Sequence, residues 1–197
     1  MIQEERPERR HKWRSLILLS VYVFLLCVLL AELEIQIEGS AGWASDLPTW
    51  RITDPAVTWL FAGRPVTGYH VFLVLFLVTV LHFPLLFAKA SIEQESKILW
   101  SLVVVAVVWD FLWFALNPSY GITRYSARHV WWFRAWFLGF PVEYFVGIAV
   151  SFIFWMLPVC KDRSSAASRA CQWGVSTGLL LFLAASVAGV RFMFFGT

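Results

Sequence analysis

Three ionisable side chains that interrupt the apolar stretches of this 197-residue chain are able to do acid–base or metal chemistry. They are His70, Asp110 and Glu143. A charged group costs free energy inside lipid, so three such groups near the same predicted membrane face indicate one shared polar site. His129 is a fourth candidate, because it lies in the loop that joins the stretches carrying Asp110 and Glu143.

These residue types suggest a metal site. Imidazoles and carboxylates are ligands of divalent cations such as Zn²⁺, and a metal-bound water becomes a nucleophile near neutral pH. One hypothesis therefore takes His70, Asp110, His129 and Glu143 as metal ligands. Without a metal, Asp110 and Glu143 could share a proton and act as general acid and base. No spacing among the four forms a recognised metal-binding motif.

The same groups could instead stabilise the fold without catalysis. Asp110 paired with His129 or Arg191, and Glu143 hydrogen-bonded to loop amides, would hold helices together. A separate candidate is His82, as a single axial ligand to haem or a chlorophyll-type pigment. No second histidine is expected at its depth, which disfavours a b-type cytochrome. The simpler interpretation is a hydrogen bond from His82 to a neighbouring helix.

The elements that must position these residues are membrane-spanning helices. The sequence is 59% hydrophobic and only 15% charged. Apolar runs long enough to cross about 30 Å of hydrocarbon, roughly 20 residues each, fall near 14–31, 69–88, 98–116, 138–158 and 173–194. We predict an all-α integral membrane protein, a compact bundle of five transmembrane helices. Residues 14–197 would form one domain with outer loops 33–68 and 117–137.

One of the loops carries a helix signal of its own. Asp54 followed by Pro55 is typical of a helix N-cap and first turn, and the helix would continue to Phe61. Trp50, Trp59 and Phe61 could then lie on the outer bilayer surface or cap the mouth of the bundle. This predicts a short amphipathic helix outside the membrane.

Small residues predict the packing faces of the last two spans. The fourth span carries a stripe of small and polar residues at every fourth position: Gly139, Glu143, Gly147 and Ser151. Such stripes pack against neighbouring helices, so Glu143 should point into the bundle. In the fifth span, Ala185 and Gly189 form a similar close-approach pair.

The distribution of basic residues predicts the orientation. The tail 1–13 is basic, and more Lys and Arg fall on its side of the five spans than on the other side. The positive-inside rule then places the amino terminus in the cytoplasm and the carboxyl terminus outside, across the cell (inner) membrane. Cys160 and Cys171 flank a predicted cytoplasmic loop, where thiols stay reduced.

The sequence favours a function inside the membrane. Twelve Trp and eighteen Phe suit a protein that packs against lipids or other membrane subunits. We expect a non-catalytic subunit or assembly factor of a membrane complex. The alternatives are a metal-dependent membrane-embedded enzyme acting on a lipid or isoprenoid, and a pigment-binding or transport protein. The basic tail is explained by orientation and anionic lipid, so no nucleic-acid partner is expected.

Overall fold

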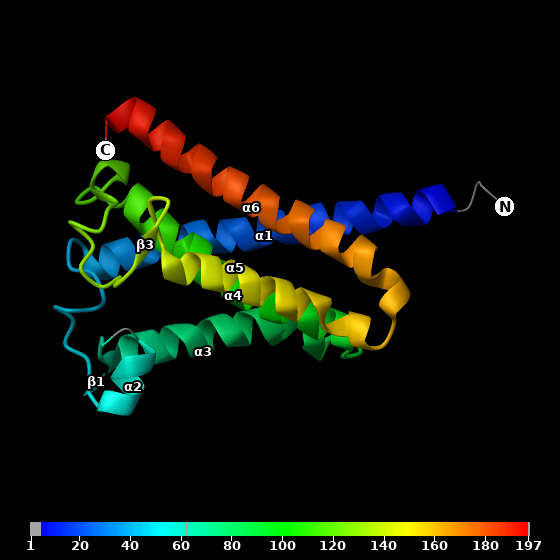
Figure 1. Ribbon diagram of the computed structural model, residues 1–197, viewed down its shortest axis with the longest axis horizontal. Helices are drawn as coiled ribbons and strands as arrows, with labels where there is room; N and C mark the ends of the chain where they lie inside the picture. The colour runs from blue at the N-terminus through cyan, green and yellow to red at the C-terminus, as the bar shows by residue number, and fades with distance from the viewer. Residues whose placement is uncertain (1–4, 62, 197) are drawn as a thin grey trace.

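Five long helices form the protein in a computed structural model, which describes residues 5–61 and 63–196. They are α1 (Glu5–Glu38), α3 (Gly68–His82), α4 (Ile92–Leu116), α5 (Val142–Met156) and α6 (Ala166–Phe195). The helices run in alternating directions, and the long connections 39–67 and 117–141 gather at one end of the bundle (Figure 1). We call this the loop end. The opposite end, where the chain starts, is the tail end.

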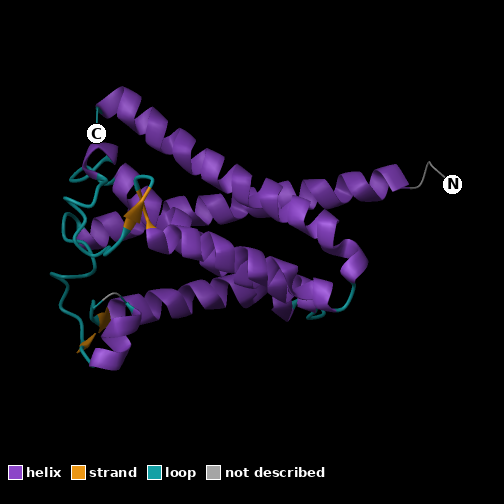
Figure 2. Cartoon of the chain, viewed as in Figure 1, coloured by secondary structure: helices purple, strands orange, loops and turns teal. Residues whose placement is uncertain are grey.

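Short helices, strands and turns lie at the two ends of the bundle. At the loop end, α2 (Pro55–Leu60) follows β1 (Arg51–Ile52), which pairs antiparallel with β2 (Val66–Thr67). A second antiparallel pair joins β3 (Trp136–Phe137) to β4 (Phe140–Pro141), as Figure 2 shows. The described residues also contain four 3₁₀ turns: η1 (Phe83–Leu86), η2 (Ile122–Arg124), η3 (Leu157–Cys160) and η4 (Arg163–Ser165).

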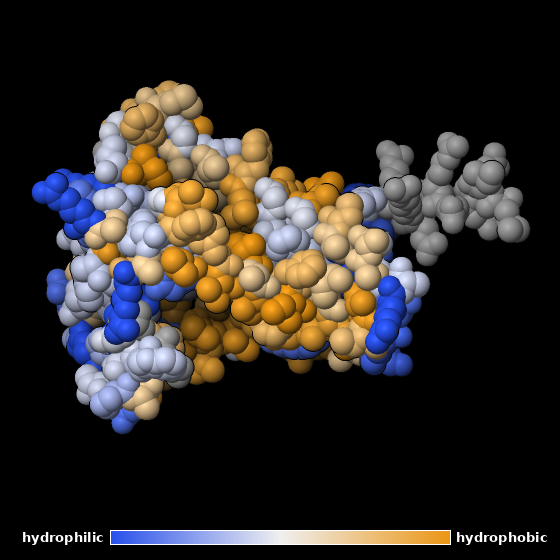
Figure 3. All heavy atoms as spheres, in the orientation of Figure 1, coloured by the Kyte–Doolittle hydropathy of each residue, from blue (hydrophilic) through white to orange (hydrophobic). Residues whose placement is uncertain are grey.

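The five long helices are apolar and long enough to cross a membrane, as the sequence predicts. The shortest candidate spans, Gly68–Leu86 and Val142–Cys160, have 19 residues each. At 1.5 Å per residue, that corresponds to about 28 Å. Figure 3 shows apolar side chains along the middle of the molecule, with hydrophilic residues toward its two ends. This distribution is typical of a protein whose middle part lies in the hydrocarbon region of a membrane.

Several helix limits differ from the predicted spans. Helix α1 continues past residue 31 to Glu38, so the start of the predicted loop 33–68 is helical. Helix α4 begins at Ile92 instead of 98, because Ser91 caps it by accepting a hydrogen bond from the backbone N–H of Gln94. Residues 1–4 of the predicted basic tail lie outside the described residues, and the rest of the tail belongs to α1.

The predicted loop helix is confirmed. Helix α2 spans Pro55–Leu60, and the Asp54 side chain accepts hydrogen bonds from Ala56 N and Val57 N at 2.9 and 3.3 Å. Pro55 occupies the first turn, where its missing N–H costs nothing. Trp59 on this helix is exposed, in agreement with a surface position.

Helix α4 is the centre of the bundle. It packs against α1, α3, α5 and α6, and its Trp100 and Phe114 are among the largest fully buried side chains. Helix α3, in contrast, packs mainly on α4 and leaves most of its apolar surface exposed. The bundle is thus organised around one helix, with α1 and α3 as separate neighbours of it.

The predicted packing stripes are partly correct. A Cβ atom on Gly147 would lie 2.6 Å from Val107, so α5 approaches α4 closely at this glycine. Gly139 does not belong to α5. Its φ of +82° places it in the turn between β3 and β4, a backbone conformation that glycine adopts without strain.

The predicted pair in the last span is wrong by one residue. Ala185 and Gly189 are exposed, whereas Ala184 and Ala188 are buried in the bundle. Neighbouring helical positions point about 100° apart, so a shift of one residue changes which face is packed. Small residues occur on both of these neighbouring helix faces, so the sequence alone did not show which face packs in the bundle.

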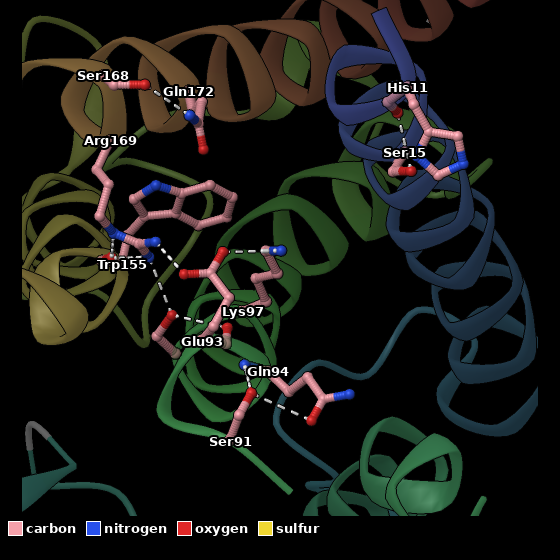
Figure 4. A network of polar contacts seen from close by, with 11 residues as sticks. His11, Ser15, Ser91, Glu93, Gln94, Lys97, Trp155, Ser168, Arg169 and Gln172 are labelled. Atoms are coloured by element: carbon pink, nitrogen blue, oxygen red, sulfur yellow. Dashed lines mark hydrogen bonds and ion pairs between the residues drawn. The ribbon is translucent and has the colours of Figure 1, made fainter. Parts of the chain in front are cut away.

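A polar network joins three helices at the tail end (Figure 4). Arg169 of α6 is 4% exposed, and its guanidinium donates to the carbonyl of Trp155 in α5 and forms an ion pair with Glu93 of α4. It also donates to Ser96 Oγ at 3.1 Å. The network satisfies the buried charge and fixes α4, α5 and α6 relative to one another.

Candidate acidic cavity at the loop end

A cavity of about 140 Å³ lies between α1, α3 and α4 at the loop end. Three carboxylates and an imidazole line it: Glu34 and Glu38 of α1, Asp110 of α4, and His70 of α3. The rest of the wall is Ala106 and four tryptophans, Trp43, Trp109, Trp113 and Trp132. The cavity is therefore acidic and aromatic. We call it the acidic cavity.

Helical periodicity brings these side chains together. Glu34 and Glu38 are four residues apart, so they stack on one face of α1. The residues that α4 contributes recur with the same period: Ala106, Trp109, Asp110 and Trp113. As a result the three carboxylates converge, and that of Glu34 is repelled by those of Glu38 and Asp110.

The chain that leaves α1 wraps around the Glu38 side chain. Glu38 Oε1 accepts a hydrogen bond of 2.7 Å from the backbone N–H of Ala44. Ala44 has a φ of +50°, in the left-handed region that residues with a Cβ seldom adopt. A conformation of this kind costs free energy, so the carboxylate contact helps to hold the turn in place.

His70 is held in a fixed orientation at the start of α3. Thr67 caps this helix by accepting a hydrogen bond of 3.3 Å from His70 N, and its hydroxyl also lies 2.7 Å from His70 Nδ1. The imidazole packs on the ring of Trp43 with their centroids 4.4 Å apart. The other ring nitrogen, Nε2, makes no hydrogen bond within the described residues.

Asp110 is bound from the opposite side of α4. The hydroxyl of Tyr144 in α5 donates a hydrogen bond to Asp110 Oδ2. Tyr144 also lines an apolar groove of about 430 Å³ between α4, α5 and α6, together with Phe111 and Ala184. The Asp110–Tyr144 pair therefore separates the acidic cavity from an apolar groove.

Arg64 is a buried cation beside these acids. Its guanidinium carbon lies 3.8 Å from the centroid of the Trp43 ring, and its Nε donates to the Phe61 carbonyl at 2.6 Å. Burial lowers the pKa of Arg64, while the carboxylates of Glu143 and Asp110 oppose that effect. Arg64 thus offsets the negative charge of Asp110 and Glu143.

Glu34 and Glu38 have no such cation bonded to them. In the described part of the chain, the ion pairs within 4.0 Å involve Glu93 and Glu95, and none reaches Glu34, Glu38 or Asp110. Buried carboxylates need a proton or a cation to avoid a large desolvation cost. The carboxylates of the acidic cavity therefore lack, within the described chain, a bonded cation that would neutralise them.

Two connecting segments close the loop end above the cavity. Trp43 Nε1 donates to the Pro65 carbonyl at 2.8 Å, and Asn117 Nδ2 donates to the Gly39 carbonyl at 2.7 Å. A Cβ on Gly42 would overlap the Trp132 ring, so this glycine allows the segment after α1 to lie directly on that indole. Together these contacts form a cover of packed aromatic rings and backbone.

An unpartnered donor also faces this region. Trp113 lines the acidic cavity and is 3% exposed, yet its indole N–H has no hydrogen-bond partner in the described structure. Buried donors without acceptors are uncommon in folded proteins and indicate that a further group is accommodated there.

The structure brings together two of the four predicted site residues. His70 and Asp110 line the acidic cavity. Glu143 is half-buried near Arg64 and one of its carboxylate oxygens lacks a hydrogen-bond partner, but it is not part of the cavity wall. His129 is exposed, with its Nδ1 3.0 Å from Ser126 Oγ.

The shared zinc site proposed for these residues therefore lacks support from the geometry. Among the described residues, no three His, Cys, Asp or Glu side chains are placed to hold a metal ion. The reason is that His129 belongs to the exposed loop surface, while the carboxylates of α1 and α4 converge on a different helix face. Arg191, a proposed counter-charge, lies instead over the Phe195 ring at 4.7 Å.

His82, the proposed pigment ligand, lies at the tail-end terminus of α3. Its Nδ1 is 2.8 Å from the Val78 carbonyl oxygen, and its Nε2 is 3.4 Å from Glu95 of α4. Both ring nitrogens thus face protein atoms. The contact with Glu95 is a link between neighbouring helices.

Glu34, Glu38 and Arg64 were not among the predicted site residues. The i, i+4 spacing of the two glutamates just beyond the first apolar run was a signal for them. Arg64 lies in a connecting segment, where periodicity gives no information on direction. No protein family model, no curated protein and no solved structure matches the chain.

Proposed function

We propose that this chain is a multi-pass protein of the inner cell membrane that binds an organic cation in the acidic cavity. In this role it would be a non-catalytic subunit or accessory factor of a membrane complex, with the loop end outside. The observation that carries the proposal is the set of three carboxylates that line one cavity without a bonded basic partner in the described chain.

The remaining wall of the cavity suits an organic cation. Indole faces attract ammonium groups through their π electrons, and four tryptophans border this cavity. Its volume of about 140 Å³ is close to the roughly 150 Å³ that accommodates a benzene molecule in an engineered protein cavity. A small alkylammonium group therefore fits in size and in charge.

Helix α3 supports an accessory role. Phe72 and Phe76 on this helix are exposed, and the helix packs mainly on α4. In a bilayer, such a face contacts lipid chains or the helices of a partner subunit. The apolar surface of α3 is thus compatible with assembly into a larger complex.

Binding of a small amine tests the proposal directly. Ethanolamine, titrated into the purified protein in lipid nanodiscs, should change the tryptophan fluorescence and raise the unfolding temperature. Glu38→Gln and Asp110→Asn should each weaken binding by about tenfold or more, corresponding to a lost charge-assisted contact. Glu32→Gln is the matched control, because Glu32 lies on α1 but is exposed.

Two results would contradict the proposal. One is a wild-type protein that shows no saturable response to ethanolamine. The other is an equal effect of Glu32→Gln and Glu38→Gln, which would assign the response to surface charge. Carboxylates that are merely protonated would give the first of these results.

A second candidate function is acid–base catalysis on a lipid or isoprenoid. It is favoured by the position of the Asp110–Tyr144 pair between the acidic cavity and the apolar groove. A carboxyl group hydrogen-bonded to a phenol can move a proton to or from a bound substrate. Mass spectrometry of lipids incubated with the protein in proteoliposomes would then show a product that disappears in Asp110→Asn; an unchanged lipid profile would exclude this function for the lipids tested.

A further inference from the structure

We infer that the ligand of the acidic cavity is a single-chain amphiphile with a protonated amine beside an oxygen acceptor, and that it reaches the cavity sideways from the bilayer between α1 and α3. This inference rests on the proposed cation binding. It adds the chemical class of the ligand and its route.

The cavity is open at the side of the bundle. Ala106 lies in its wall and is exposed, although its neighbours Val105 and Val107 on α4 are buried. Helices α1 and α3 each pack on α4, but no comparable packing joins α1 to α3. Figure 1 shows the two helices well separated on either side of α4. The surface of α4 around Ala106 is therefore accessible between them.

The loop end offers no comparable route. The Trp43–Pro65 hydrogen bond ties together two parts of the connection 39–67, and the Asn117–Gly39 hydrogen bond joins that connection to 117–141. The Trp132 ring fills the space at Gly42 between the same segments. A molecule that is dissolved in the bilayer thus has a shorter path to the carboxylates than one dissolved in water.

The depth of the carboxylates matches the head of a lipid-like molecule. Asp110 lies six residues before Leu116, the last residue of α4, which corresponds to about 9 Å along the helix. An interfacial amphipathic helix buries its apolar face roughly 5–10 Å into the boundary between headgroups and acyl chains, which is a comparable depth. An amine anchored at this level would therefore meet Glu34, Glu38 and Asp110.

The wall of the cavity specifies two features of the head. Its carboxylates accept hydrogen bonds and favour a protonated amine. The buried indole N–H of Trp113 requires an acceptor, which a hydroxyl or ether oxygen supplies. An amino alcohol carries both groups within one small head.

The chain of the amphiphile would continue along α4 toward the tail end. Leu102 and Leu99 lie four and seven residues before Ala106, on the same helix face, and both are half-buried. Apolar side chains in this row would contact an alkyl chain lying between α1 and α3. Each buried methylene adds roughly 0.8 kcal/mol in favour of such binding.

Three probes separate the head from the chain. N-dodecylethanolamine carries both, ethanolamine lacks the chain, and 1-dodecanol lacks the amine. For wild-type protein in nanodiscs, N-dodecylethanolamine should bind at least tenfold more tightly than ethanolamine after correction for its partition into protein-free nanodiscs. 1-Dodecanol should not displace it. Glu38→Gln should weaken both amines.

One pair of variants tests the route. Leu102→Trp places a bulky side chain on the tail-end side of the cavity. It should weaken the binding of N-dodecylethanolamine by tenfold or more, while the affinity for ethanolamine stays unchanged. Val146→Trp on the exposed face of α5 is the matched control and should change neither. Both variants must give the helical circular dichroism of wild type, and the comparison of the three probes needs no variant.

The outcomes distinguish the two proposals. If neither amine binds, cation binding itself is wrong, and this inference falls with it. If ethanolamine binds but the dodecyl chain adds no affinity, or if Leu102→Trp has no effect on the amphiphile, the cavity takes a water-soluble cation and this inference alone is overturned. Displacement by 1-dodecanol would likewise overturn it, because the amine would not be recognised.

Discussion

The hydroxyl of Tyr144 in α5 donates a hydrogen bond to Asp110 Oδ2 in α4, and this contact joins the wall of an acidic cavity to that of an apolar groove. The two helices cross closely, because Gly147 one turn further along α5 leaves room for Val107. A buried carboxylate, a phenol and a glycine thus define how α5 lies on the central helix.

Removal of the Tyr144 hydroxyl should destabilise the bundle. Tyr144→Phe leaves Asp110 without this donor, so we expect the free energy of unfolding to fall by about 1–3 kcal/mol. Reversible unfolding in mixed detergent micelles, followed by tryptophan fluorescence, measures the change. Tyr120→Phe is the control, since the Tyr120 hydroxyl makes an exposed 3.2 Å contact with the Ser40 carbonyl and should matter little. Equal losses in the two variants would contradict the assigned role of Tyr144.

The buried arginine at the tail end should be more sensitive than its surface neighbour. Arg169→Met removes the partner of Glu93 and leaves the Trp155 carbonyl without its donor, with an expected loss of about 3–5 kcal/mol. Lys97→Met breaks a partly exposed 2.9 Å ion pair with the same Glu93 and should cost about 0–1 kcal/mol. The same unfolding assay ranks the two variants, and the reverse order would show that the network is not what holds α6.

Packing of the cover over the cavity should depend on Gly42. In Gly42→Ala the new methyl group would overlap the Trp132 ring, and we expect a loss of about 1–3 kcal/mol and a shift in tryptophan emission. Gly174→Ala, at a helical position with open space around it, should instead gain about 0.5–1 kcal/mol. If both substitutions act alike, the effect comes from glycine flexibility in general and not from this contact.

Tyr125 should make the protein less stable at high pH. Burial, with repulsion from Asp110, raises the pKa of Tyr125 above its ordinary value of 10.0. The folded state therefore holds this proton more tightly than the unfolded state, so the contribution is complete below about pH 10 and is lost as the pH rises further. Unfolding measured from neutral to alkaline pH should show a shallower decline in Tyr125→Phe. An identical slope in wild type and variant would contradict the prediction.

Labelling of thiols tests the proposed orientation. Cys160 and Cys171 are exposed at the tail end and Cys27 is buried, so a membrane-impermeant maleimide should label the protein only after the cells are permeabilised. Asp46→Cys, at an exposed loop-end position, should be labelled in intact cells. Labelling of the native cysteines in intact cells would indicate the opposite orientation.

The sequence by itself determined the number and nature of the helices. Apolar runs of sufficient length permit only a few structures in lipid, because every backbone polar group must be bonded within the chain. Local chemistry also determined the Asp54 cap of α2, since an N-cap depends on residues adjacent in sequence. These features need no knowledge of how the helices meet.

Tertiary structure decided which polar residues share a site. The sequence places His70 and Asp110 near the same end, but depth alone does not tell which helix faces converge. Only the packing of α1 on α4 brings Glu34 and Glu38 to Asp110, and only the loop conformation brings Arg64 to Trp43. His129 lies at the same end and yet is exposed. A helix repeats every 3.6 residues, so helix rotation, which is set by contacts distant in sequence, selects the members of the site.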